Sequence, residues 1–212
     1  MNDRKSDMRA LERHYSELFR KHGDTPAATQ QRDRETQERR MGRLCEIAPD
    51  VAQARILDFG CGAGHLLHVL RRDFDFCGRF TGYDLSLPHI EAARTKFPDA
   101  VFERRDILEV GIEGRFDYAF VNGTFNNLIA DNWGFVTEVL ATLYGACDRG
   151  VAFNLLSSYV DYNDTGLYYA EPERIFAHCK REITPLVTLR HDYRLKPGVI
   201  PYEFTVYLHR NG

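Results

Sequence analysis

Three glycines and one acid form the pattern whose chemistry is clearest in this sequence. The run Ile56-Leu57-Asp58-Phe59 is apolar except for its carboxylate, and it leads into Gly60-Cys61-Gly62-Ala63-Gly64. Apolar residues then recur at helical spacing from Leu66, so the stretch predicts a strand, a tight turn and a helix. Glycines suit a turn with positive φ where a ligand contacts bare backbone, and the following helix presents free N–H groups. The combination predicts a nucleotide-binding loop.

Polar residues also stand where the next predicted strands end. Asp84 lies about 24 residues beyond the first glycine, where a carboxylate can accept both ribose hydroxyls of a nucleoside. Asp106 is suited to accept from an adenine amino group while Ile107 covers the ring. Asn122 and Gly123 end the fourth strand. Ligands of open α/β sheets bind outside the carboxyl ends of the strands, so we expect these residues around one ligand.

The same residues distinguish between two kinds of nucleotide. A dinucleotide site is expected to show G-x-G-x-x-G, but the third glycine here is Gly64 and the next position holds His65. Asp58 would repel a pyrophosphate and attract an ammonium group. A ligand with an amino-acid end, a ribose and an adenine is S-adenosylmethionine. The residues therefore favour S-adenosylmethionine, and a nicotinamide dinucleotide is the alternative.

Strands and helices must alternate to position these residues, and the chain after Pro49 shows that pattern. The expected strands are residues 55–59, 79–84, 101–105, 116–122 and 150–156, and the expected helices are residues 65–73, 87–97, 131–146 and 172–180. Two final strands, residues 186–193 and 203–209, are joined by a short connection. A short connection suits an antiparallel pair, so they predict a hairpin at the sheet edge.

Residues 1–48 predict a helical N-terminal extension, and residues 49–212 predict the main domain. An apolar stripe indicates a first helix; it consists of Met8, Leu11, Tyr15, Leu18 and Phe19. The run 23–26 ends that helix, and a second helix is expected from Thr29 to Ile47. We interpret its charged face as solvent-exposed. The alternative is a lid in which Gln30, Arg34 or Arg39 reaches over the ligand.

Residues 157–171 form a loop too long to be a simple connector. The loop carries four tyrosines: Tyr159, Tyr162, Tyr168 and Tyr169. It leaves the carboxyl end of the fifth strand, where aromatic walls can enclose a small acceptor molecule. We expect Tyr159, Tyr162 and Tyr169, together with Asn126, to bind that substrate. Ordinary core packing of a long loop is the alternative.

The run 56–64 resembles the first motif of class I S-adenosylmethionine-dependent methyltransferases. Asp84, the pair Asp106-Ile107 and the strand 116–122 follow in that family's order and spacing, and the likeness covers roughly residues 55–156. It implies an α/β fold with a seven-stranded, mostly parallel Rossmann-like sheet and an antiparallel C-terminal hairpin strand. The implied cofactor contacts are Asp58, Gly60, Cys61, Gly62, Gly64, Asp84, Leu85, Asp106, Ile107, Asn122 and Gly123.

Two differences from related enzymes reduce the range of possible methyl acceptors. The family often carries an acid at the Asn122 position, and its absence counts against metal-assisted methylation of a catechol. Enzymes that methylate nucleobase amines carry an Asn/Asp-Pro-Pro-aromatic run at the same position, the end of the fourth strand. The run 122–125 lacks both prolines, which counts against DNA and glutamine amides as substrates.

Methyl transfer from a sulfonium needs positioning more than it needs a base. The acceptor is held about 3 Å behind the methyl carbon, and water is excluded. A general base would help a hydroxyl acceptor, and the candidates by position are His191, Tyr193, Glu203 and Asn126. We name His191 as the catalytic candidate, with a structural histidine as the alternative.

A pair of histidines and a cysteine could be interpreted as a metal site and a nucleophile, but the sequence does not favour either role. His65 and His68 are three apart on the first helix after the glycines, but no third ligand is near in sequence, so no metal site is expected. Cys61 stands in the glycine turn, where a small residue fits, and we interpret it as packing and not as a nucleophile.

The composition limits which binding partners and which cellular compartment are expected. The 212 residues carry a formal net charge of −3, with 43% hydrophobic residues, so one globular domain without a general basic surface is expected. This predicts neither a nucleic-acid nor a membrane partner. Five cysteines without a C-x-x-C pair favour a reducing cytoplasm. Neither a signal peptide nor an apolar membrane span is evident. A homodimer is compatible with all of these features.

We therefore expect an S-adenosylmethionine-dependent methyltransferase that acts on a hydroxyl or amine of a small molecule, such as a sugar or secondary metabolite. Two alternatives stay open. One is an NAD-dependent oxidoreductase. The other is a non-catalytic S-adenosylmethionine-binding subunit, because no obligatory base is evident and such a subunit could keep every glycine.

Overall fold

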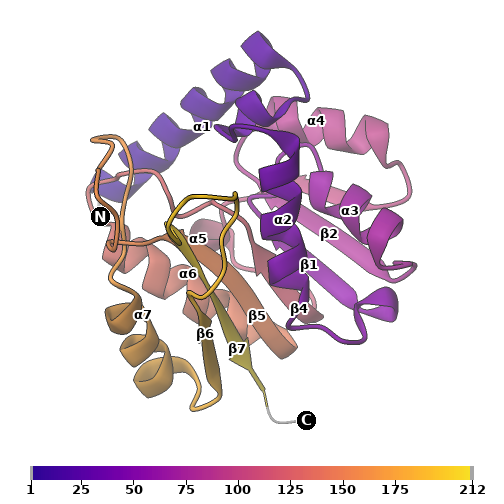
Figure 1. Cartoon of the computed structure of the whole chain (residues 1–212). Coiled ribbons are helices and arrows are strands. Elements are labelled where there is room, and N and C mark those ends of the chain that lie inside the picture. Colours follow the sequence, from indigo (N-terminus) through magenta and orange to yellow (C-terminus); the bar gives the residue numbers. More distant parts are fainter. Residues whose placement is uncertain (1, 211–212) are drawn as a thin grey trace.

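A seven-stranded sheet in the order β3-β2-β1-β4-β5-β7-β6 organises the chain, of which the computed structural model describes residues 2–210 (Figure 1). The strands are β1 (Arg55–Phe59), β2 (Arg79–Asp84), β3 (Val101–Arg104), β4 (Phe116–Val121), β5 (Cys147–Leu156), β6 (Val187–Arg190) and β7 (Glu203–His209). β1 to β5 pair in parallel, and β7 pairs antiparallel with both β5 and β6. The predicted α/β class, its mostly parallel sheet and the C-terminal hairpin are confirmed.

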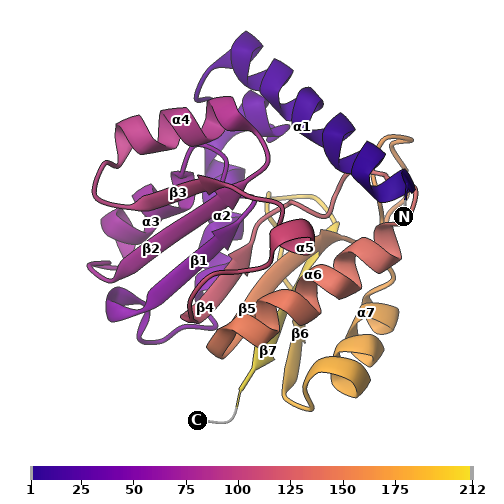
Figure 2. The same ribbon diagram turned by 180° about the vertical axis from the view of Figure 1, so that it is seen from behind.

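Helices cover both faces of the sheet (Figure 2). They are α1 (Asn2–His22), α2 (Arg34–Cys45), α3 (His65–Asp73), α4 (Leu87–Lys96), α5 (Ile107–Val110), α6 (Asn132–Ala146) and α7 (Pro172–His178), and α7 continues into a π-helical turn at Cys179–Ile183. One buried apolar cluster joins the sheet to α2, α3 and α4, and a second joins it to α5, α6 and α7. The alternating in-and-out side chains of the strands supply both clusters.

No helix within residues 2–210 has the length and apolarity that crossing a membrane requires.

The second helix begins later than its sequence predicts. Residues 26–29 form a 3₁₀ turn, and α2 starts only at Arg34, five residues after the predicted Thr29. The reason is a helix cap, because the Asp33 side chain accepts a hydrogen bond from the Thr36 N–H at 2.7 Å. Gln30 takes a left-handed conformation with φ of 56°. Residues 30–33 are therefore a linker, which crosses the edge of the sheet.

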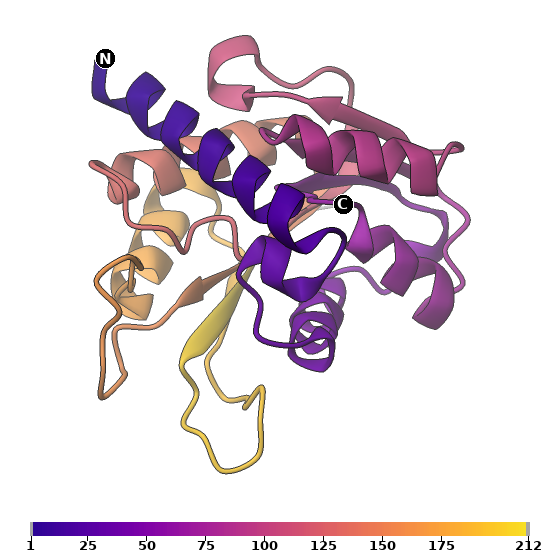
Figure 3. The same ribbon diagram turned by 90° about the horizontal axis from the view of Figure 1, so that it is seen from above.

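α1 lies across the carboxyl edge of the sheet, the edge where the parallel strands end (Figure 3). Met8 of this helix is 7% exposed and belongs to the core cluster of α6. The Ser16 hydroxyl lies 3.1 Å from the Ser86 hydroxyl at the start of α4. The N-terminal extension is thus packed over the edge at which ligands of such sheets bind.

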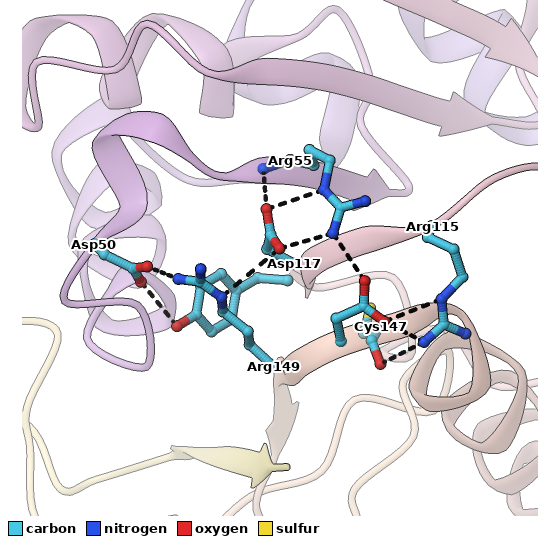
Figure 4. Close-up of polar contacts among 8 residues, drawn as sticks. Asp50, Arg55, Arg115, Asp117, Cys147 and Arg149 are labelled. Atoms are coloured by element: carbon cyan, nitrogen blue, oxygen red, sulfur yellow. Dashed lines mark hydrogen bonds and ion pairs between the residues drawn. The ribbon is translucent and has the colours of Figure 1, made fainter. Parts of the chain in front are cut away.

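Ion pairs fasten the opposite, amino edge of the sheet (Figure 4). Asp117 at the start of β4 accepts from the Arg55 backbone N–H at 2.7 Å and from its guanidinium at 2.9 and 3.2 Å. Arg55 also donates to Asp148 of β5 at 2.8 Å. Three neighbouring strands are joined in this way, away from the glycine turn.

Candidate active site

The turn after β1 has the conformation that its glycines predict. Gly60, Gly62 and Gly64 have φ values of 77°, 52° and 76°. A Cβ on Gly60 would lie 2.1 Å from the Thr124 hydroxyl, which donates to the Phe59 carbonyl at 3.1 Å. Side chains are excluded here by both backbone conformation and space. The turn therefore leaves its backbone bare toward the pocket beside it.

Asp58 presents a carboxyl group to this pocket from the end of β1. The residue is 3% exposed and lines the cavity wall. Burial and, second, the charge of Asp84 raise the pKa of Asp58 to about 8. A buried carboxylate without a partner is costly, so a cation placed beside it is strongly favoured. The site is suited to an ammonium group.

Asp84 connects the end of β2 to the glycine turn. One carboxylate oxygen accepts from the Gly62 N–H at 2.9 Å, and the other accepts from the Ser86 N–H at 2.8 Å. These bonds fix the carboxylate toward the pocket and leave further lone pairs for a ligand. Two adjacent ribose hydroxyls match that geometry.

The far end of the pocket is apolar with one acid. The Asp106 side chain accepts from the Leu108 N–H at 3.0 Å and caps α5, while Leu85 and Leu108 line the wall. Ile107 is 2% exposed and packs in the core cluster instead. The aliphatic neighbour that can cover an adenine ring is therefore Leu108, one residue beyond the predicted Ile107.

The N-terminal extension supplies part of the wall of this first pocket. Pocket-lining side chains from α1 and the segment that follows it are Met8, Leu11, Tyr15, Phe19, Thr29, Gln31 and Arg34. The spacing of the α1 residues predicts an apolar stripe but does not say what the stripe covers. Of the three proposed lid residues, Arg34 lines the cofactor pocket and Gln30 lines a second pocket, whereas Arg39 donates to the Leu195 carbonyl and to Glu35.

A second pocket opens next to the first. It lies between the linker after η1 (Pro26–Thr29), the tyrosine loop 157–171 and the loop before β7. The predicted substrate residues Asn126, Tyr162 and Tyr169 line it. Four residues line both pockets: Tyr15, Thr29, Gln31 and Gly123. The two cavities therefore meet beside Gly123, at the end of β4.

Tyr15 is a polar residue at this junction that sequence reasoning assigned only to packing. Its hydroxyl accepts from Asn127 Nδ2 at 2.5 Å and donates to Gln30 Oε1 at 3.1 Å. Burial raises the pKa of Tyr15 to about 12. The phenol therefore keeps its proton at neutral pH and acts as a hydrogen-bonding group, not as a base.

A buried charged network lies beside Gly123, where the two pockets meet. Arg40 of α2 donates to Glu203 of β7 at 2.7 Å, and their side chains are 10% and 1% exposed. Asn154 donates to Glu203 at 3.3 Å and accepts from the Gly123 N–H at 2.6 Å. Although burial opposes the charge, the Glu203 carboxylate raises the pKa of Arg40 above its ordinary value. The network ties α2, β5 and β7 to the strand end where the pockets meet.

The structure places several predicted site residues outside the pocket walls. Nε2 of His191 lies 3.1 Å from the Pro201 carbonyl oxygen, and neither pocket includes His191. Tyr159 is 59% exposed and donates to Glu173. These placements favour the structural role that the sequence left open for His191. Gly64 packs against the Phe102 ring and also lies outside the walls.

Burial governs the titration of Cys61 and of His65. Burial raises the pKa of the Cys61 thiol well above its usual range, so the thiolate is disfavoured. Nε2 of His65 lies 2.9 Å from Glu38, yet burial lowers the pKa of His65 to about 4. No cluster of metal-binding side chains is found within residues 2–210.

Comparison with known proteins identifies the family. Residues 50–144 match the family described as Methyltransferase domain. The chain is 35% identical over 157 residues to Rv1506c of Mycobacterium tuberculosis, which bears the name of a methyltransferase; the match covers 71% of this chain and 90% of that protein.

Solved structures share the fold. The plantazolicin methyltransferase BpumL, in complex with SAH, matches with a TM-score of 0.63 and 14% identity over 98% of this chain and 99% of its own. An S-adenosylmethionine-dependent methyltransferase from Mesorhizobium loti matches with a TM-score of 0.60 and 16% identity over 80% of this chain and 96% of its own. The chain therefore belongs to the class I S-adenosylmethionine-dependent methyltransferases, as its motifs predict.

Proposed function

We propose that this methyltransferase transfers a methyl group to a hydroxyl or amine of a small molecule held in the second pocket. The observation that carries the proposal is the meeting of the two pockets at Gly123. A methyl donor in the first pocket and an acceptor in the second would face each other there. The aromatic and amide side chains around the second pocket suit a small polar molecule.

The first pocket offers a group for each part of S-adenosylmethionine. Asp58 would pair with the ammonium group, Asp84 would accept the ribose hydroxyls, and Asp106 would face the adenine amino group. The backbone at Asn122 and Gly123 would lie near the sulfonium, which carbonyl dipoles favour. Residues of this chain thus fit the cofactor in the order in which the strands present them.

Positioning would supply most of the catalysis. S-adenosylmethionine carries an activated methyl group, so the protein has to hold the acceptor in line and exclude water. The α1 side chains over the first pocket serve exclusion, and the network of Arg40, Glu203 and Asn154 keeps the strand end fixed. No side chain is required to act as a base in this arrangement.

Two further features support the small-molecule assignment and its setting. A phosphoethanolamine N-methyltransferase of Haemonchus contortus shares the fold, with a TM-score of 0.59 and 17% identity over 73% of this chain and 38% of its own, and it was solved with S-adenosyl-L-methionine. All five cysteines are free, and four are buried, which fits a reducing cytoplasm. We further propose that residues 1–48 are a lid that moves when the cofactor enters.

Calorimetric titration with SAH and with NAD tests the cofactor assignment. We expect SAH to bind and NAD not to bind, because the carboxyl group of Asp58 can pair with an ammonium group but offers no favourable contact to a pyrophosphate, and its ionised form would repel one. Binding of NAD alone would overturn the proposal.

Transfer itself is tested with methyl-³H-labelled S-adenosylmethionine and small-molecule extracts of the native host. Incorporation above a boiled-enzyme control supports the proposal. If SAH binds but broad conditions give no incorporation, the chain is better described as a cofactor-binding subunit.

A further inference from the structure

The side chain of Gln31 stands where the two pockets meet. Gln31 lines both cavities, and its Nε2 lies 3.3 Å from the place that a Cβ on Gly123 would occupy. Its backbone is held as well, since the Gln31 N–H donates to the Pro26 carbonyl at 2.8 Å. An amide group is thus presented beside the strand end at which methyl transfer is proposed.

Arg40 decides which end of that amide faces the junction. An Arg40 guanidinium N–H donates to Gln31 Oε1, and Arg40 is itself fixed by the bond to Glu203 at 2.7 Å. Guanidinium has donors and no acceptor, so the oxygen of Gln31 must face Arg40. The NH₂ group is therefore directed away from Arg40, and no bond from it is found within residues 2–210. The junction receives two free hydrogen-bond donors.

Such donors discriminate between acceptor atoms. A hydroxyl or carboxylate oxygen has more than one lone pair, so it can accept from Gln31 and still attack the methyl carbon. A neutral amine has a single lone pair, which the same donor would occupy, and its own N–H groups would face the NH₂ of Gln31. The geometry favours oxygen, because an acceptor molecule that covers the NH₂ group without accepting from it would leave these donors unpaired.

We propose that Gln31, oriented by Arg40 and Glu203, makes this enzyme an O-methyltransferase; the inference rests on the proposed function and narrows its acceptor to oxygen. An oxygen lone pair forms the new bond to the methyl carbon while the carbon–sulfur bond breaks and its electron pair stays on sulfur, which yields SAH. A hydroxyl acceptor loses its proton to solvent water at the open side of the second pocket, where the lining residue Tyr162 is 71% exposed.

The test asks where the label goes in products formed from host extract. Hot hydriodic acid cleaves O-methyl ethers and esters to volatile iodomethane, whereas N-methyl and C-methyl groups are retained. Release of most of the tritium as iodomethane supports the inference. Retained tritium overturns it while leaving the methyltransferase assignment intact. No incorporation at all contradicts the proposed function, and the inference falls with it.

A matched pair of variants tests the residue. Gln31→Glu keeps an oxygen for Arg40 and replaces the donors with an acceptor, so O-methylation should fall by about tenfold or more. Circular dichroism and the thermal unfolding midpoint should match those of the unmodified protein, which shows that the variant is folded. Gln53→Glu is the control, since Gln53 is exposed and lines neither pocket. Undiminished O-methylation by Gln31→Glu would overturn the role of Gln31.

Discussion

At the scale of single residues, this site depends on two carboxyl groups with different surroundings. Asp84 accepts two backbone N–H bonds from the loops on either side of it, at 2.9 and 2.8 Å. No described residue donates to Asp58, which is 3% exposed. The surroundings of Asp84 orient a carboxylate toward hydroxyl donors, whereas those of Asp58 favour a cation beside it. Each predicts its own response to mutation or pH.

Replacement of Asp84 should weaken cofactor binding without unfolding the chain. Asp84→Ala removes the charged acceptor for two hydroxyls, so the affinity for SAH should fall by about 100-fold or more. Calorimetry measures the affinity, and circular dichroism checks the fold. Asp99→Ala is a suitable control, because Asp99 pairs with Arg71 on the exposed surface and lines neither pocket. Unchanged affinity in Asp84→Ala would refute the ribose assignment.

The pKa of Asp58, raised to about 8, predicts pH-dependent binding. Below that value the free protein holds a neutral carboxyl, so pairing with an ammonium group must release a proton. The affinity for SAH should rise as pH increases from about 6 and level off near pH 8, where the ligand's own α-amino group begins to lose its proton. Titration in buffers of different ionisation enthalpy measures the released proton.

The Asp58→Asn variant provides the control. It should bind SAH more weakly and release no proton. The unmodified protein without ligand should lose stability as pH rises from about 4 to about 8. The reason is that the Asp58 carboxyl has a higher pKa in the folded than in the unfolded state, so the folded state binds its proton more tightly. An affinity independent of pH between 6 and 8 would show that Asp58 does not meet the ammonium group.

At the scale of elements, α1 has two roles, since it completes the core and covers the cofactor pocket. Met8 packs with the α6 cluster and also lines the first pocket, as do Tyr15 and Phe19. Its outer contacts are surface ion pairs, such as Lys5 with Glu109 at 2.8 Å. Exposed pairs of this kind contribute little to stability. If α1 is the proposed lid, these surface pairs would oppose its opening only weakly.

Hydrogen exchange tests whether α1 acts as a lid. SAH should slow amide exchange in α1 and in residues 23–31 by about tenfold or more, because the ligand adds contacts beneath them and local opening becomes rarer. The amides of α7, which lines neither pocket, serve as the internal control. Equal protection with and without SAH would mean that α1 is a fixed part of the wall.

At the scale of the whole molecule, the two edges of the sheet carry different polar networks, one beside the pockets and one that joins the strands. The carboxyl edge holds the pockets and the buried pair of Arg40 and Glu203. The amino edge holds the pairs of Arg55 with Asp117 and Asp148, shown in Figure 4. A ligand site can thus keep costly unpaired groups such as Asp58, while hydrogen bonds elsewhere stabilise the strands.

Asp117 should contribute stability at neutral pH and lose it in acid. Hydrogen bonds from Arg55 hold the pKa of Asp117 below its usual range. Its contribution is complete above the unfolded value of about 3.9 and disappears as pH falls through the folded value. Asp117→Asn should lower the free energy of unfolding by about 1–2 kcal/mol at pH 7.

Denaturant unfolding at pH 7 and pH 3 measures this difference, which should be smaller at pH 3. The affinity for SAH should be unchanged, because Asp117 lies at the opposite edge from the pockets. An equal loss at both pH values would show that the carboxylate charge is not involved.

Local patterns predict much of the fold and the residues that gather in the first pocket. β1, β2, α3 and β7 begin and end at the predicted residues. The glycine turn and the ends of β1 to β4 bring Asp58, Asp84 and Asp106 to one pocket. These features depend on periodicity and on turns of a few residues, and parallel pairing then fixes which strand ends are neighbours.

Contacts between distant segments decide the rest. Nothing near Gln31 indicates that Arg40 would turn its amide toward Gly123, because that orientation depends on Glu203, 163 residues beyond Arg40. Leu108 and not Ile107 faces the pocket because Ile107 is taken into the core. The sequence by itself determined the fold and the methyl donor. Only the tertiary structure decided where α1 lies and which donors face the junction of the two pockets, since those groups meet through packing and not through spacing.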